Sequence, residues 1–130
     1  SDAVAGLERM KQHYMIGTLS NGNIALIANM AKYARLPWDV ILGAEIARAY
    51  KPQPQAYLGS AAALSLKPQQ CMLVAAHNSD LKAALDCGFR TAFVERPFEH
   101  GPGQSTDLVA SGHYDFIASD FVDLADQLKC

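Results

Sequence analysis

Apolar residues along the chain follow two alternating patterns, and together these patterns predict strands that are each followed by a helix. Short runs that are mostly apolar are typical of strands buried on both faces. These runs lie at residues 14–19, 40–42, 71–76, 91–94 and 116–118. Between them, apolar residues recur three or four positions apart, as they do on one face of a helix. The helical stretches include residues 2–12, 24–34, 57–62, 80–87 and 121–128.

Local signals mark the ends and the inward faces of these elements. Asp2 and Asp120 are placed to cap the first and last helices, and Gly88 can end the helix at 80–87 in a left-handed conformation. On the second and third helices, the residues predicted to face inward are Ile24, Ile27, Met30, Ala31, Ala34, Tyr57, Leu58, Ala61 and Ala62. The alternation predicts an α/β fold, a three-layer Rossmann-like parallel sheet in one domain over residues 1–130.

Composition favours a protein that acts on a small molecule. Half of the 130 residues are hydrophobic and the net charge is −2, with acids and bases interspersed. No basic stripe is present to attract nucleic acid or an anionic membrane, and no apolar run approaches the roughly 20 residues that span a bilayer. The three cysteines are few and far apart, which suits reduced thiols, so we expect a cytoplasmic protein.

Polar residues cluster at or just after the ends of three predicted strand units. The clusters are Ser20-Asn21, Lys51, and His77-Asn78-Ser79-Asp80. In open parallel sheets, ligands bind beyond the carboxyl ends of the strands. We therefore expect these clusters to meet in one site.

Each cluster has a chemical interpretation and a structural one. Ser20 and Asn21 can offer a hydroxyl, an amide and N–H groups to an oxyanion, or simply cap the next helix. Lys51 can hold a nucleophilic carboxylate ionised, or be a solvated loop lysine. Asp80 can orient Lys51 or a hydrolytic water, or stabilise its helix dipole. His77 can act as a base or as a structural hydrogen-bonding group.

A long loop from Arg96 to Gly112 carries further polar residues. Glu99 and His100 lie within this loop, and His113 follows it directly. A loop of this length either borders a site or covers the surface. Both interpretations stay open.

Several short segments, taken in order, resemble one enzyme family. Thr-Leu-Ser-Asn-Gly at 18–22 is followed by Tyr-Lys-Pro at 50–52 and by Val-Ala-Ala-His-Asn-Ser-Asp-Leu at 74–81. The segments at 51–57 and 95–103 add to the likeness. Nearly the whole chain resembles the haloacid dehalogenase superfamily, and specifically its type II 2-haloacid dehalogenase branch.

The resemblance implies a chemistry and a role for each residue. In this family an aspartate at the end of the first core strand displaces halide from C2 of the substrate, and water hydrolyses the resulting ester. Lys51 would pair with that aspartate, and Asp80 would position Lys51 or the water. The residues implied in substrate binding are Ser20, Asn21, Tyr57, His77 and Asn78.

The resemblance also bears on cofactors. The Mg²⁺-dependent phosphatases of the superfamily place an acid four residues before the last aspartate, and that position here is Ala76. We therefore expect no metal and no cofactor. Ala75 and His77 stand where better-known dehalogenases carry Ser and Asn. The alternative functions are a phosphatase of the superfamily and a non-catalytic binding or oligomeric domain.

The family's nucleophile motif, Asp-x-x-Gly-Thr, has no counterpart before Ser20. In the complete fold its strand lies mid-sheet, between the strands that contain Ile16 and Leu73. The resemblance thus predicts a core without its first strand and cap domain, inactive alone and with a gap in its sheet. A longer native protein, a strand rearrangement or another chain, as in a homodimer, would close the gap.

Overall fold

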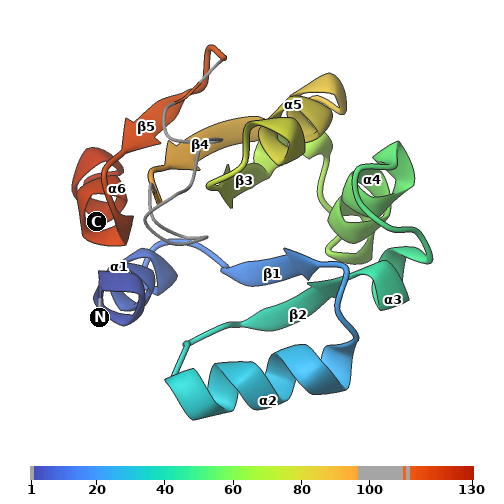
Figure 1. Ribbon diagram of the computed structural model, residues 1–130, viewed down its shortest axis with the longest axis horizontal. Helices are drawn as coiled ribbons and strands as arrows, with labels where there is room; N and C mark the ends of the chain where they lie inside the picture. The colour runs from blue at the N-terminus through green and yellow to red at the C-terminus, as the bar shows by residue number, and fades with distance from the viewer. Residues whose placement is uncertain (1, 97–109, 111) are drawn as a thin grey trace, which may run out of the picture.

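The computed structural model describes residues 2–96, 110 and 112–130, and these residues form an α/β fold (Figure 1). The strands are β1 (Gly17–Ser20), β2 (Val40–Gly43), β3 (Met72–Ala75), β4 (Arg90–Val94) and β5 (Phe116–Ala118). The helices are α1 (Asp2–Lys11), α2 (Ile24–Ala34), α3 (Ala44–Ala47), α4 (Pro54–Ala63), α5 (Asn78–Asp86) and α6 (Phe121–Gln127), with a 3₁₀ turn at Pro68–Gln70. The predicted fold class is confirmed.

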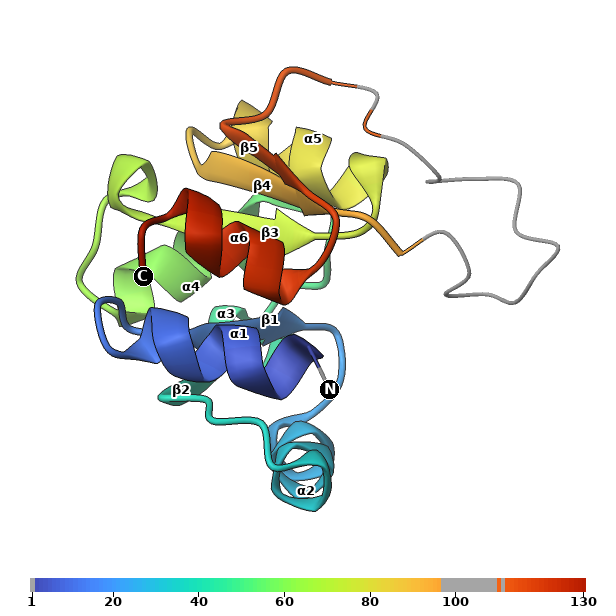
Figure 2. The same ribbon diagram turned by 90° about the vertical axis from the view of Figure 1, so that its left-hand side faces the viewer.

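The strands are all parallel, but they form two separate sheets. β1 pairs with β2, from Gly17 opposite Val40 to Ser20 opposite Gly43, and the second sheet has the order β3-β4-β5. Figures 1 and 2 show β1 on the side of its sheet that faces β3. Within the described residues these two strands do not pair. The expected central gap is therefore present, and no rearrangement among the described strands closes it.

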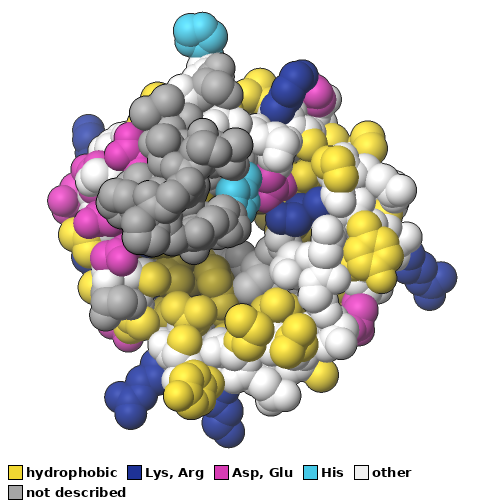
Figure 3. Space-filling view, viewed as in Figure 1, with side chains coloured by type: hydrophobic (Ala, Val, Ile, Leu, Met, Phe, Trp, Pro, Cys, Tyr) yellow, Lys and Arg dark blue, Asp and Glu magenta, His cyan; other side chains and the backbone are white. Residues whose placement is uncertain are grey.

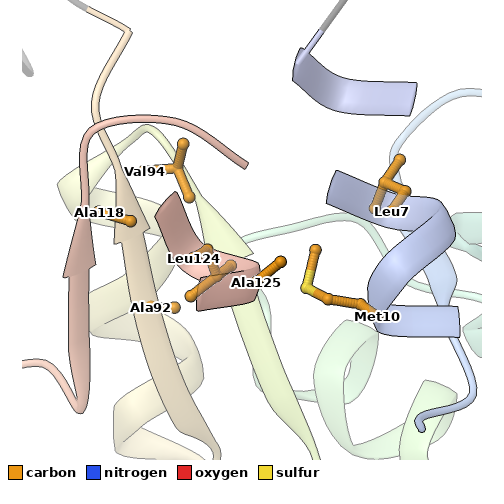
Figure 4. Close-up of a cluster of buried hydrophobic side chains, with 7 residues drawn as sticks. All are labelled: Leu7, Met10, Ala92, Val94, Ala118, Leu124 and Ala125. Atoms are coloured by element: carbon orange, nitrogen blue, oxygen red, sulfur yellow. The ribbon is translucent and has the colours of Figure 1, made fainter. Parts of the chain in front are cut away.

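One hydrophobic core lies where α1 crosses α6 against the three-stranded sheet. Figure 4 shows its buried members, which are Leu7, Met10, Ala92, Val94, Ala118, Leu124 and Ala125. The two helices approach closely at Gly6, where a Cβ atom would lie 2.5 Å from the Phe121 carbonyl oxygen. A glycine is therefore required at this crossing.

A second core lies on the other face of the three-stranded sheet and connects that sheet to the β1-β2 sheet. Its buried members are Ala56, Tyr57, Leu73, Leu81, Ala84 and Phe93. Leu19 of β1 packs against this cluster although β1 pairs with no strand of that sheet. Side-chain packing, through Leu19 and Tyr57, thus holds β1 and α4 beside the three-stranded sheet.

Several sequence-based boundaries were wrong. The first strand begins at Gly17 instead of residue 14, because the chain turns after α1 and the Tyr14 N–H donates to the Met10 carbonyl. The helix predicted from residue 80 begins at Asn78, and the four-residue α3 was not predicted. Asp2 lies inside α1, and its carboxylate accepts from the Phe121 N–H of α6.

Four residues predicted to face inward are exposed. Met30 on α2 and Leu58 on α4 are 56% and 39% exposed, and Ala34 on α2 and Ala62 on α4 are exposed as well. On α2, Ala31 is the buried residue. Glu99, His100 and the rest of the 97–109 segment lie outside the described residues. No helix in the described ranges is long and apolar enough to span a membrane.

Candidate functional site

Lys51, Tyr57 and Asp80 meet in one hydrogen-bonded cluster. Lys51 lies on the turn between α3 and α4, Tyr57 on α4, and Asp80 in the first turn of α5. The Lys51 ammonium donates to Asp80 Oδ2 at 2.7 Å, and the Tyr57 hydroxyl donates to Asp80 Oδ1 at 2.6 Å. Both oxygens of the Asp80 carboxylate are therefore engaged by donors from two other segments.

Burial gives this cluster its electrostatic character. The side chains of Lys51 and Asp80 are 23% and 15% exposed, and Tyr57 is fully buried. Burial, and after it the hydrogen bond to Asp80, raise the pKa of Tyr57 well above its ordinary value. Its hydroxyl therefore stays protonated at neutral pH and remains a donor to Asp80. An ion pair so far removed from water interacts more strongly than one on the surface.

A hollow opens beside the cluster. It has a volume of about 400 Å³ and is lined by Lys51, Pro52, Tyr57, His77, Ser79 and Asp80. Figure 3 shows basic, acidic and histidine side chains gathered next to a hollow near the middle of this face. An ammonium at the edge of such a space can bind a carboxylate, or stabilise negative charge that develops during a displacement.

Neither Ser20 nor Asn21 is among the described residues that line this hollow. The Ser20 hydroxyl accepts from the Gly22 N–H at 3.0 Å, which folds the turn after β1. The side chain of Asn21 bonds to the main chain of Lys51. The expected meeting of the first two clusters thus occurs through the backbone of Lys51.

His77 and Asn78 are neighbours in sequence but point to different places. His77 is the N-cap residue of α5 and lines the hollow beside Asp80. Asn78 borders a second hollow of about 440 Å³, and its Oδ1 accepts from the Tyr114 hydroxyl at 2.7 Å. Tyr114 in turn stacks on Phe93, with the ring planes 4° apart. Asn78 therefore belongs to a structural contact between α5 and the segment before β5.

Sequence reasoning had not assigned Pro52, Ser79 or Tyr114. Ser79 and Pro52 each adjoin an assigned residue, so their position next to Asp80 and Lys51 was a usable signal. Tyr114 lies far along the chain, and no spacing rule connects it with Asn78. Over residues 2–96, 110 and 112–130, no group of three or more His, Cys, Asp or Glu side chains is arranged to hold a metal ion.

Comparison with known proteins places this geometry in a family. No protein-family model matches the chain. The chain is 32% identical over 98 residues to the (S)-2-haloacid dehalogenase 4A of Burkholderia cepacia. The matched region covers 73% of this chain and 42% of that enzyme. The chain thus spans less than half the length of that curated relative.

Two solved structures are more similar still. The L-2-haloacid dehalogenase PA0810 is 52% identical over 98% of this chain, with a TM-score of 0.96, and 55% of it is covered. The defluorinating L-2-haloacid dehalogenase Rha0230 is 54% identical over 99% of this chain, with a TM-score of 0.97, and 53% of it is covered. The chain therefore belongs to the haloacid dehalogenase superfamily, on its type II 2-haloacid dehalogenase branch, and spans about half of these relatives.

Proposed function

We propose that this chain is the part of a longer 2-haloacid dehalogenase that carries Lys51, Tyr57 and Asp80. One observation carries the proposal: the Lys51 ammonium, held 2.7 Å from Asp80, borders a hollow of about 400 Å³. The similarity to L-2-haloacid dehalogenases over nearly the whole chain supports the same conclusion. The substrates would be small 2-haloacids, and the chain by itself would be inactive.

The reaction that the family implies needs a carboxylate in the gap between β1 and β3. An aspartate there attacks C2 of the haloacid, forms a carbon–oxygen bond, and expels halide with its bonding electron pair. Water then hydrolyses the ester, which releases the 2-hydroxy acid and a proton and restores the aspartate. In this proposal the Lys51 ammonium keeps the attacking carboxylate ionised and offsets the negative charge that grows on the departing halide.

Asp80 has a positioning role in this proposal. Because Lys51 and Tyr57 each bond to one of its oxygens, the carboxylate fixes where the ammonium lies. The alternative role from the sequence, direct orientation of the hydrolytic water, would use the acceptor sites that these two bonds leave, since a carboxylate has about four. We assign Asp80 to Lys51 first because the bond to the ammonium is the contact that the structure gives.

The test uses the longer protein and follows halide release from 2-chloropropionate. We expect Lys51→Ala to lower kcat at least about a hundredfold, since one such electrostatic group is typically worth that much. The matched control is Lys82→Ala, because the Lys82 side chain is 77% exposed and pairs with Asp86 instead of Asp80. This control should keep the wild-type rate.

A second substrate separates this function from its rival. If the longer protein releases phosphate from a phosphomonoester in the presence of Mg²⁺, and releases no halide, the dehalogenase proposal is overturned. Equal halide release by wild type and Lys51→Ala would instead overturn the role of Lys51 alone.

We also propose that the protein works in the cytoplasm. The support is its three cysteines, Cys71, Cys87 and Cys130, which are free thiols in the structure. Burial raises the pKa of the Cys71 and Cys87 thiols, which disfavours the reactive thiolate. Such thiols suit a reducing compartment.

A further inference from the structure

Asn21 holds the main chain of Lys51 with both polar atoms of its side chain. Its Oδ1 accepts from the Lys51 N–H at 2.8 Å, and its Nδ2 donates to the Lys51 carbonyl at 3.4 Å. The two bonds engage the N–H and the carbonyl of one residue, as the opposite residue of an antiparallel strand does. Asn21 and Lys51 are 30 positions apart in sequence, so this contact joins two separate loops.

We propose that Asn21 is a positioning residue for Lys51, an inference that rests on the proposed dehalogenase function. A lysine side chain is long and has four flexible bonds, so the location of its ammonium depends on what holds each end. Asp80 holds the ammonium. Asn21 holds the backbone from which the side chain starts.

Asn21 is well supported for this task. Ser20 before it is tied into the sheet opposite Gly43, and its hydroxyl accepts from the Gly22 N–H. Asn23 after it caps α2, with its Oδ1 accepting from the Leu26 N–H at 2.7 Å. Asn21 therefore lies on a turn that is anchored to a strand on one side and to a helix on the other.

The contact needs an asparagine in particular. It requires an acceptor for the Lys51 N–H and a donor for the Lys51 carbonyl, and the amide supplies both. Aspartate would keep the acceptor and lose the donor, whereas alanine would lose both. Because both bonds of Asn21 go to Lys51, we expect its loss to change the chemical step more than substrate affinity.

The experiment compares Asn21→Ala, Asn21→Asp and a control, Asn29→Ala, in the longer protein. Asn29 is an exposed asparagine on α2. We expect Asn21→Ala to lower kcat for halide release roughly ten- to hundredfold with KM changed less than about twofold, as misplacement of a catalytic group does. Asn21→Asp should fall between wild type and Asn21→Ala, and Asn29→Ala should match wild type.

Three kinetic outcomes would overturn the proposal. A raised KM with unchanged kcat would make Asn21 a direct substrate contact. Unchanged kinetics would make its bonds to Lys51 irrelevant to turnover. An Asn21→Asp variant no more active than Asn21→Ala would show that the bond to the Lys51 N–H contributes nothing.

Amide hydrogen exchange at Lys51 gives a readout that does not depend on turnover. Asn21→Ala should speed exchange of the Lys51 N–H, while Asn29→Ala and Asn21→Asp should leave it protected. If wild type released no halide, the proposed function would fail, yet exchange would still test the contact. Unchanged exchange in Asn21→Ala would overturn the positioning role whatever the activity.

Discussion

Tyr57 shows how a single residue can serve both the core and the site. Its ring is fully buried and packs edge-on against Phe89, with centroids 6.0 Å apart, while its hydroxyl bonds to Asp80. A buried tyrosine commonly combines an apolar body with one satisfied hydroxyl in this way. The hydrogen bond is therefore the part of Tyr57 that can be removed without disturbing the packing.

Replacing Tyr57 by phenylalanine removes that donor and leaves one oxygen of a mostly buried carboxylate without it. We expect the free energy of unfolding to fall by about 1–3 kcal/mol, as for a hydrogen bond to a charged group. Urea unfolding of the longer protein would measure this loss. Tyr33→Phe is the control, since Tyr33 is 93% exposed. Equal stability of the two variants would contradict the importance of the Tyr57–Asp80 bond.

Gly43 occupies a position where both the backbone conformation and the available space require a glycine. Its φ is +140°, and a Cβ atom would lie 2.0 Å from the Ser20 carbonyl oxygen. We expect Gly43→Ala to destabilise the protein by roughly 1–3 kcal/mol or more, from backbone strain and this clash together. Thermal unfolding with Gly88→Ala as comparison tests the clash. Gly88 also has a positive φ, +91°, but its nearest neighbour would be 3.5 Å away. If the two variants lost equal stability, the clash would carry no cost.

At the scale of elements, Asp2 ties α1 to α6. Its carboxylate accepts from the Arg96 guanidinium at 2.7 Å and from the Phe121 N–H at 3.1 Å. Arg96 also lies over the Phe121 ring, 5.0 Å from its centroid. The Arg96 hydrogen bond, and then the Phe121 N–H, hold the pKa of Asp2 below its ordinary value.

This lowered pKa makes the contact between the two helices depend on pH. Because Asp2 has a lower pKa folded than unfolded, it contributes stability above its unfolded pKa of about 3.9. That stability is lost as the pH falls through the folded pKa. We expect Asp2→Asn to lower Tm relative to wild type at pH 7, and the difference to shrink below about pH 4. A difference in Tm that is the same at pH 7 and pH 3 would contradict this role.

Most elements could be predicted because their signals are local. The Asp120 side chain caps α6 by accepting from the Asp123 N–H, and Gly88 ends α5 with a positive φ, both as predicted. α3 is four residues long, too short to show a helical period. Tyr14 and Met15 are apolar yet exposed, because their place is decided by the turn after α1 rather than by their own type.

At the scale of the whole molecule, the sequence predicted that Lys51 and Asp80 would lie in one site, but it did not predict the hydrogen bonds that hold them there. Asp80 follows β3 closely, as the parallel topology predicts, whereas Lys51 reaches it from the turn after α3. The contact of Asn21 with the backbone of Lys51 depends on the exact course of two loops, and no sequence period encodes it. The bond between Asn78 and the Tyr114 hydroxyl joins residues 36 positions apart, so it too depends on the tertiary fold and not on a local pattern.

The two sheets face each other at β1 and β3, which do not pair. Each of these strands has an edge whose main-chain groups no described strand satisfies, and such edges accept extended peptide from any source. Two strand edges of this chain are therefore unpaired within the described residues, and unpaired edges of this kind favour edge-to-edge aggregation.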